Sequence, residues 1–282
     1  MADSNPGRIT SCLGGVARNV SENLARLGVS VSLLTAVGTD HEGKRIQSEC
    51  RRLGIDLHHS LITEEDPSSS YLALMNEKGD LVAAISDMMI LERLTVSFFE
   101  ERAPMLAAAD ILIVDTNLSR ESLEWLLRTY AHKKIFLDPV SIAKTHRVRD
   151  LSGLCHCLKV NRMEAEVLAD MAIRSEGDLR QAAQQLIDRG SKRIFITLGP
   201  EGVYACQQGE HCRTAASFLK PASASGAGDA FMAAAIYGEI MEWPLFETAR
   251  FSVAAAAVAL LSQETVSEEM SVDRVQQVME SR

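Results

Sequence analysis

The hydrophobic residues of this chain lie in short continuous runs that are separated by longer amphipathic stretches. Runs typical of buried strands cover 31–37, 110–114, 134–138, 157–160 and 193–198. Between them, apolar residues recur with helical spacing over 16–27, 42–53, 119–130, 162–169 and 176–189, and from about residue 227 the pattern is mostly helical. Alternating strands and helices are typical of a parallel sheet with helices on both faces. We therefore predict one α/β domain over 1–282 with a doubly wound, mostly parallel sheet.

Residues 69–86 break this alternation. Two runs with strand-like composition, 69–75 and 81–86, flank a polar turn at 76–80. This pattern predicts a β-hairpin. Because it interrupts an α/β pattern, we interpret it as part of a small β-lid rather than as a pair of core strands.

Composition and charge narrow the functional classes. The chain has 282 residues, 46% of them hydrophobic and 24% charged, as in an ordinary globular protein. The net charge of -9 argues against a general nucleic-acid surface but not against a small ligand. The longest run of small apolar residues, 253–261, is far shorter than the roughly 20 residues of a membrane helix. Because no apolar run is long enough for such a helix, we expect no membrane partner. The six cysteines show no C-x-x-C spacing, so we expect a reducing, cytoplasmic environment and no disulfide framework.

The run Gly226-Ala227-Gly228-Asp229 has the strongest chemical signal. Two glycines precede a segment of helix formers, so backbone N–H groups at the start of a helix can approach an anion. A carboxylate repels phosphate, which points to a chemical role such as taking a proton from an attacking hydroxyl group. Asp229 is equally consistent with an acidic residue that stabilises the helix dipole. The motif alone does not separate these two interpretations.

A second glycine pair, Gly14-Gly15, precedes an amphipathic helix that carries Asn19 about one turn from its start. The glycines allow close backbone contact with a ligand, and the Asn19 amide can bond to sugar hydroxyls. A glycine-rich helix entry with a surface Asn is the favoured alternative when this segment is taken alone. The segment Gly38–Arg45 resembles a P-loop but has Arg45 where Ser or Thr should hold magnesium, so we interpret it as a structural turn.

Two further motifs follow predicted strands, where open α/β sheets bind ligands. Asn161 and Glu164 can orient phosphate and hold hydrated magnesium, although the same spacing is that of a capping box. Thr197, Gly199 and Gly202 can border a nucleotide, although a plain β-turn fits the same residues.

Taken together and in this order, these segments resemble the PfkB family of carbohydrate and nucleoside kinases, which have the ribokinase-like fold. The resemblance runs from about residue 4 to the C-terminus and also includes the motifs at 37–43 and 138–139. Single motifs are weak, but the ordered set is specific. Within the family, residues 4–28, 69–72 and 85–88 are similar to members that phosphorylate the 5′-hydroxyl of pseudouridine.

The resemblance implies a role for each motif. Asp229 would be the catalytic base, and Gly226, Ala227 and Gly228 would form the anion hole for the transferring phosphoryl group. ATP and Mg²⁺ would be the cofactors, with Glu164 reaching the metal through water. The ATP site would include Asn161, Glu164, Thr197, Gly199 and Gly202; the sugar site would include Gly14, Gly15, Asn19, Ser70 and Asp87.

The same resemblance implies lid segments near 4–13 and 56–88, pairing of lids in a homodimer, and a monovalent cation such as K⁺ near the anion hole. Two departures from the family pattern stand out. The family begins with a hydrophobic strand whose Asp grips the sugar, and no residue before Gly14 matches it, so we expect that strand to be absent from the sheet. The residues Ser223-Ala224-Ser225 also differ from the family's cation motif. Another sugar or nucleoside kinase of the family, and a nucleotide-binding protein without catalysis, therefore remain alternatives.

Overall fold

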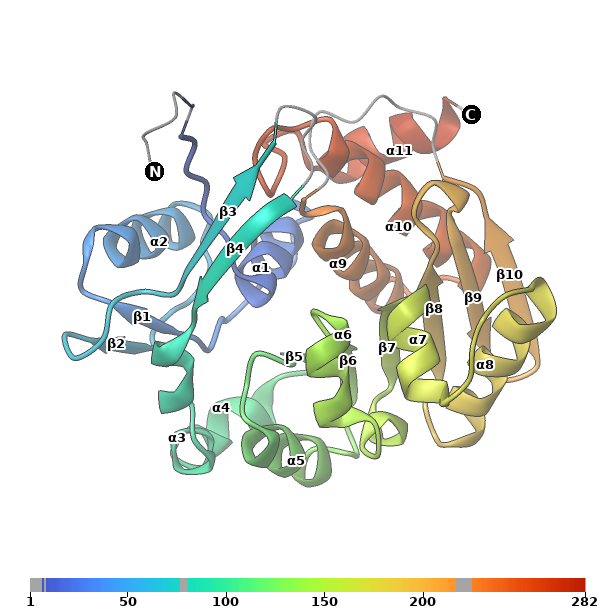
Figure 1. Cartoon of the computed structure of the whole chain (residues 1–282), viewed down its shortest axis with the longest axis horizontal. Coiled ribbons are helices and arrows are strands. Elements are labelled where there is room, and N and C mark those ends of the chain that lie inside the picture. Colours follow the sequence, from blue (N-terminus) through green and yellow to red (C-terminus); the bar gives the residue numbers. More distant parts are fainter. Residues whose placement is uncertain (1–6, 8, 77–80, 217–224, 282) are drawn as a thin grey trace, which may run out of the picture.

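A six-stranded mixed sheet forms the centre of the structure (Figure 1). The computed structural model describes residues 7, 9–76, 81–216 and 225–281. The strand order is β10-β9-β8-β7-β6-β5. Strands β5 to β8 run parallel, whereas β9 and β10 are antiparallel to their neighbours. The bounds are β5 Ile111–Asp115, β6 Lys134–Asp138, β7 Cys157–Asn161, β8 Arg193–Thr197, β9 Val203–Gln207 and β10 Glu210–Thr214.

The prediction of an α/β fold with a mostly parallel sheet is confirmed, and four of the five predicted strands lie in this sheet. The fifth, expected over 31–37, is regular only as β1, Ala36–Gly38, which pairs with β2, Leu61–Thr63, in a separate parallel pair. The ladder is irregular before β1 because the Thr35 N–H donates to the Ser60 hydroxyl instead of to a backbone carbonyl. Among the described residues, β5 is an edge strand of the main sheet.

Helices cover both faces of the main sheet, as the alternating pattern predicts. Side chains of α3, α4, α5, α7 and α8 pack on one face, and side chains of α1, α9 and α10 pack on the other. Helix α11 packs on α10, and α2 lies against the residues that precede β1. None of the described helices is long and apolar enough to cross a lipid bilayer. The bounds are α1 Val16–Arg26, α2 His41–Arg52, α3 Val96–Glu100, α4 Ala103–Ala108, α5 Arg120–Thr129, α6 Ile142–Thr145, α7 Arg162–Ala169, α8 Glu176–Asp188, α9 Ala227–Ile240, α10 Leu245–Leu260 and α11 Val272–Glu280; short 3₁₀ turns are η1 Met89–Arg93, η2 His146–Val148, η3 Ser152–Leu154 and η4 Gly199–Glu201.

Strand β7 shows how the sheet divides its side chains between the two layers. Leu158 and Val160 belong to the cluster under α5, α7 and α8, whereas Cys157 belongs to the cluster under α1 and α9. Because side chains alternate along a strand, Lys159 lies on the same face as Cys157. A charged side chain is thereby placed on the face that α9 covers.

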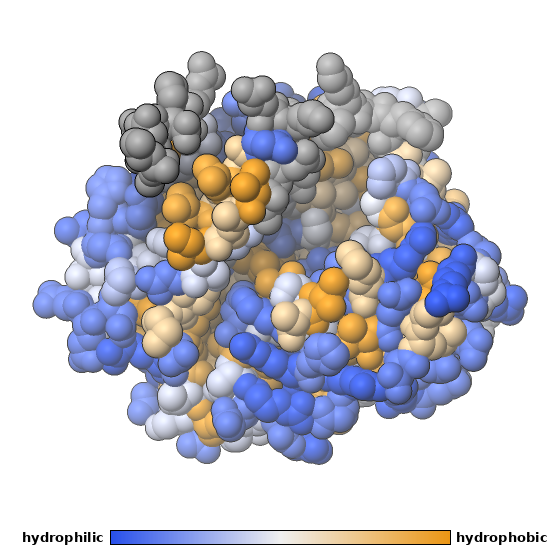
Figure 2. Space-filling model, in the orientation of Figure 1, coloured by the Kyte–Doolittle hydropathy of each residue, from blue (hydrophilic) through white to orange (hydrophobic). Residues whose placement is uncertain are grey.

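The predicted hairpin is present as β3, Ser70–Met75, and β4, Leu81–Asp87; most of its turn, 77–80, lies outside the described residues. The hairpin forms its own two-stranded sheet. Its apolar side chains are about 60% exposed, and Figure 2 shows them gathered at the upper left of the molecule. We call this group the hairpin patch: Tyr71, Leu72, Leu74, Met75, Val82 and Ile85.

Near its C-terminal end, α9 is held by a cluster of charges. Glu239 lies 2.6 Å from Lys134 Nζ, 3.2 Å from His156 Nε2 and 3.1 Å from an Arg193 guanidinium nitrogen. These three partners come from the N-terminal ends of β6 and β8 and from the turn before β7. Burial opposes ionisation of Glu239, but its cationic partners lower its pKa to about 2. The cluster therefore ties α9 across three neighbouring strands.

We expect Glu239→Gln to destabilise the fold, because it leaves the partly buried Arg193 guanidinium without its anion and removes the pair with Lys134. The loss should be about 3 kcal/mol in the free energy of unfolding at neutral pH. It should shrink as the pH falls from 4.5 towards about 2, where the wild-type carboxylate becomes protonated. Urea unfolding over this pH range measures both effects. Glu247→Gln is the matched control because Glu247 is exposed on α10; equal losses in the two variants would contradict the role of the cluster.

Candidate active site

A row of charged side chains crosses the C-terminal ends of three neighbouring strands. Asp115 of β5 stands opposite Asp138 of β6 in the ladder. Lys159 of β7 lies with its Nζ atom 2.5 Å from Asp138 Oδ2. All three lie on the face that α1 and α9 cover, at the edge where parallel α/β sheets bind ligands.

Helix α9 begins above this row with a left-handed glycine. Gly226 has φ +81°, and a Cβ atom at this position would lie 1.8 Å from the Thr265 carbonyl oxygen. No other residue type fits there, so the glycine sets both the conformation and the close packing of the turn. The helix has no side-chain cap at its start. The N–H groups of Ala227, Gly228 and Asp229 therefore have no intrahelical acceptor and form a ready anion site.

Asp229 lies in the first turn of α9 and accepts a hydrogen bond of 2.7 Å from Asn19 Nδ2. Burial raises the pKa of Asp229 to about 7, although the positive charge of Lys159 and the Asn19 hydrogen bond act in the opposite direction. A carboxyl group that titrates near neutral pH is suited to accept a proton from a hydroxyl group. The structure thus gives Asp229 an environment that a solvent-exposed helix-capping residue would not have.

Asn19 reaches Asp229 because a distant carboxylate fixes the start of α1. Gly15, with φ +95°, turns the chain into α1, and Asp115 accepts a hydrogen bond of 3.2 Å from the Ala17 N–H. The Asn19 amide oxygen accepts a hydrogen bond from Arg18. Both polar atoms of Asn19 are therefore engaged inside the protein. The sequence predicted an amide directed at sugar hydroxyls, whereas the structure directs its nitrogen at Asp229.

The glycine pair before α1 lies close to the turn that precedes α9. Arg18 donates to the carbonyl oxygens of Leu13 and Gly14, each over 2.8 Å. Thr265, whose carbonyl oxygen packs on Gly226, donates its hydroxyl to the Leu13 carbonyl oxygen over 2.6 Å. Gly14 and Gly15 are thus brought near the anion site through Thr265.

Asn161 and Glu164 form the capping box at the start of α7 that their spacing predicts. The Asn161 side chain accepts from the Glu164 N–H over 2.9 Å, and Glu164 Oε2 accepts from the Asn161 N–H over 2.8 Å. Burial raises the pKa of Glu164, while this backbone hydrogen bond and Lys159 lower it. Glu164 is 4% exposed. A buried carboxyl group beside the charged row can serve the cap and still face a cation.

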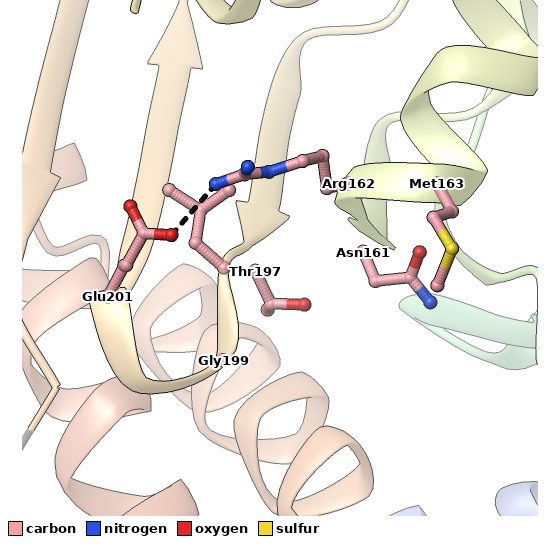
Figure 3. Close-up of a pocket in the computed structure, with 7 residues that line it drawn as sticks. Asn161, Arg162, Met163, Thr197, Gly199 and Glu201 are labelled. Carbon is pink, nitrogen blue, oxygen red and sulfur yellow. Dashed lines mark hydrogen bonds and ion pairs between the residues drawn. The ribbon is translucent and has the colours of Figure 1, made fainter. Parts of the chain in front are cut away.

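A pocket of about 260 Å³ lies between this capping box and the turn after β8 (Figure 3). Asn161, Thr197 and Gly199 line it, and an ion pair of 3.0 Å between Arg162 and Glu201 closes one side. Gly202 lies behind the turn, where a Cβ atom would be 1.9 Å from the Thr214 carbonyl oxygen. The structure therefore gathers the residues predicted to border a nucleotide, with Gly202 shaping the turn.

Ser70 and Asp87 stand opposite each other in the ladder of the hairpin. Both are exposed. The Ser70 hydroxyl donates to the Ser68 carbonyl oxygen over 3.5 Å, and the Asp87 carboxylate accepts from the Met89 N–H over 3.4 Å, so both bonds stay next to the hairpin. In the described part of the chain, no hydrogen bond joins them to Asn19 or Asp229. Other predicted features cannot be placed, because residues 4–6 and 8 of the N-terminal lid segment, and Ser223-Ala224 before the anion site, lie outside the described residues.

Lys159 and Asp115 are site residues that the sequence motifs did not reveal. Lys159 interrupts the apolar run of a buried strand, which is the one signal that could have pointed to it. Asp115 ends another such run. Within the described ranges, no group of three or more His, Cys, Asp or Glu side chains is placed to hold a metal.

Comparison with known proteins gives a consistent set of relatives. A family model described as pfkB family carbohydrate kinase matches residues 2–271. Pseudouridine kinase of Escherichia coli K12 is 34% identical over 281 residues, which are 99% of this chain and 90% of that protein. An uncharacterised sugar kinase of the same organism, YeiI, is 33% identical over 96% of this chain and 75% of its own length.

Solved structures agree with these relatives. A putative sugar kinase from Clostridium perfringens superposes with a TM-score of 0.89 at 30% identity, covering 99% of this chain and 88% of that one. Ribokinase from Thermotoga maritima superposes with a TM-score of 0.82 at 19% identity, covering 95% of this chain and 87% of that one. The fold is therefore ribokinase-like.

We expect Asp229→Asn to stabilise the protein, because it removes a partly buried carboxyl group whose ionisation costs free energy. The folded state holds this proton up to about pH 7, whereas the unfolded chain releases it near 3.8, so wild-type stability falls as the pH rises between these values. At about pH 8 the variant should gain on the order of a few kcal/mol, and the gain should shrink at lower pH. Urea unfolding of the variant and the wild type, at about pH 8 and again near pH 4, measures this difference in the free energy of unfolding. Asp110→Asn, at an exposed carboxylate, is the control; a pH-independent effect of Asp229→Asn would contradict the assigned environment.

Proposed function

The chain belongs to the pfkB family of carbohydrate kinases, phosphotransferases that act on an alcohol group, and on that premise we propose that it transfers the γ-phosphoryl group of ATP to the 5′-hydroxyl of a ribose-bearing substrate, with pseudouridine as the first candidate. The observation that carries the proposal is the partly buried Asp229 in the first turn of α9, with a pKa raised to about 7, beside N–H groups that have no intrahelical acceptor. The choice of pseudouridine is supported by the similarity to the Escherichia coli enzyme.

The chemical step assigned to this site is an in-line displacement. The substrate 5′-oxygen attacks the γ-phosphorus, its proton passes to Asp229, and the bond from phosphorus to the bridging oxygen of ADP breaks. The N–H groups of Ala227, Gly228 and Asp229 stabilise the negative charge on the transferring group. The Asn19 hydrogen bond fixes the orientation of the carboxylate that receives the proton.

We assign ATP to the pocket between α7 and the turn after β8. Thr197 and Gly199 would border the nucleotide, Gly202 would hold the turn, and Asn161 would orient the phosphates. Glu164 would contact Mg²⁺ through water, using the carboxylate oxygen that does not accept the Asn161 N–H. The ion, when bound, neutralises charge on the phosphates.

We assign the sugar to the space beside Gly14, Gly15 and Asn19, which Thr265 holds near the anion site. The hairpin, with Ser70 and Asp87 at its base, would close over the sugar as a lid. Because the ATP site, the sugar site and the lid would then act together, we treat 1–282 as one kinase domain with 56–88 as a lid segment. Among the described residues neither Ser70 nor Asp87 is hydrogen-bonded to Asn19, so the proposed lid would bring them to the sugar by closing.

Other members of the family remain a second candidate, since YeiI is nearly as similar as pseudouridine kinase. A sugar kinase would prefer a free sugar to a nucleoside. A protein that binds nucleotide without catalysis would bind ATP and turn over none of these alcohols. The same assays, run with and without K⁺, test the proposed monovalent cation.

We also propose a cytoplasmic location, which is supported by the six cysteines, all of them unpaired.

We expect ADP release from ATP and Mg²⁺ with pseudouridine, and little with uridine, ribose or adenosine, when each is offered separately. The rate should rise with pH through about 7, because Asp229 must be ionised to accept the proton. Asp229→Asn should abolish turnover and leave ATP binding intact, as measured by calorimetry. Turnover with ribose alone would favour the sugar-kinase alternative, and unchanged turnover in Asp229→Asn would refute the mechanism.

The hairpin patch suggests that a second copy of the chain covers the lid. An isolated hairpin is marginally stable in water, and its apolar side chains need a partner surface. We expect light scattering to show a dimer. Leu72→Asp with Ile85→Asp, at facing positions that are 63% and 65% exposed, should give a monomer with a raised KM for the alcohol. Phe246→Asp, at an apolar residue 47% exposed on α10, is the control; a monomeric wild type would refute the dimer.

A further inference from the structure

The ammonium group of Lys159 occupies an unusual place in this fold. Lys159 is 8% exposed in the middle of the sheet, where its neighbours in β7 are apolar. Its Nζ atom lies 2.5 Å from Asp138 Oδ2 and 3.1 Å from the Cβ position of Gly228. Gly228 thus leaves room for an ammonium group against the first turn of α9.

Stability alone does not account for this arrangement. A helix N-terminus carries partial positive charge, so a cation beside it is unfavourable. A buried ion pair such as Lys159–Asp138 is also seldom more stable than two well-packed apolar side chains. The burial of a lysine in this place therefore indicates that a second negative charge, in addition to Asp138, binds next to it.

The charges that surround the site show where that negative charge belongs. Asp229 from α9 is faced by Lys159 from β7, Asp138 from β6 and Asp115 from β5, and α1 contributes the neutral Asn19. Glu164, from α7, also acts on Lys159. Acidic groups thus outnumber the lysine around the point where a phosphoryl group with further negative charge would enter.

We infer that Lys159, held by Asp138 beneath Gly228, is a positioning residue for phosphoryl transfer. Its fixed positive charge keeps Asp229 ionised while the phosphoryl group occupies the start of α9. The inference rests on the proposed function and adds to it a residue that none of the sequence motifs contains. It also gives Asp138 a role, as the group that prevents the lysine side chain from turning away. Gly228 suits this arrangement, since a Cβ atom there would lie 3.1 Å from Lys159 Nζ and press on the ammonium group.

The electrostatic effect of Lys159 on its surroundings is consistent with this role. Burial alone lowers the pKa of Lys159, but Asp138, Asp229 and Glu164 raise it above its ordinary value, so the group stays charged. Among the charged groups that act on Asp229, Lys159 acts most strongly and lowers the pKa of that carboxyl group. Loss of the lysine should therefore protonate Asp229 over a wider pH range.

The test compares Lys159→Met with Lys134→Met in the full-length protein. Lys134 also pairs with a carboxylate of α9, but at the opposite end of the helix. In Lys159→Met, kcat should fall on the order of 100-fold, the acid limb of the kcat/KM profile should move to higher pH, and the KM for the alcohol should stay near its wild-type value. Lys134→Met should leave the acid limb and kcat near the wild-type values.

A second measurement does not depend on turnover. In ligand-free protein with ¹³C-labelled aspartate, the Asp229 carboxyl resonance, assigned by its loss in Asp229→Asn, should titrate at higher pH in Lys159→Met than in the wild type. If Lys159→Met does not fold, Lys159→Met with Asp138→Asn removes both charges at once. Lys159 acts on Asp229 more strongly than Asp138 does, so the upward shift should persist at reduced size.

The outcomes separate the two proposals. If the wild type phosphorylates none of the alcohols, the proposed function fails, and the Asp229 titration still decides the role of Lys159. If Asp229 titrates in Lys159→Met as it does in the wild type, the inference about Lys159 is refuted whichever alcohol is the substrate. A fall in kcat without a shift of the acid limb would likewise overturn it, because that result indicates a structural role.

Discussion

Burial of charge beneath the start of α9 is the constraint on which the rest of the site depends. Asp229 must be shielded from water to titrate near neutral pH, yet it must not stay protonated when a hydroxyl group needs a base. Asn19 and Lys159 are the groups that oppose the effect of burial. The packing of α1 and α9 on the sheet brings both of them to the carboxylate, so the proposed chemistry depends on helix placement.

Helix α9 is controlled by charges at both of its ends. At the start, Lys159 adds positive charge to the positive end of the helix dipole, and near the end Glu239 adds negative charge to the negative end. Each charge is unfavourable next to a helix end of the same sign, and opposite charges on the sheet offset this cost. Glu239 binds cations from the N-terminal ends of strands, and Lys159 binds Asp138 at a C-terminal end. The pairs of Glu239 tie the end of α9 to the sheet, whereas the Lys159–Asp138 pair joins β6 to β7 beneath its start.

Contacts between distant parts of the chain complete the site. Gly226 adopts its left-handed conformation directly against the Thr265 carbonyl oxygen, and Thr265 also binds the Leu13 carbonyl oxygen. Asp115, nearly 100 residues away in sequence, accepts a hydrogen bond from the first turn of α1. The start of α9, the glycine pair and the start of α1, from which Asn19 reaches Asp229, are therefore held by connected contacts.

The sequence by itself determined the alternation of strands and helices, the hairpin, the capping box of Asn161 and Glu164, and the ordered motifs that identify the family. These features depend on local periodicity or on residues a few positions apart, which a linear pattern records. It did not predict that the strand at 31–37 is regular only from Ala36, because that depends on which backbone groups find partners. Only the tertiary structure decided that Asn19 bonds to Asp229 and that Lys159 lies against Gly228, since both contacts join elements far apart in the chain. Burial and the distances between charges set the protonation of a carboxyl group, and neither exists until the chain is folded.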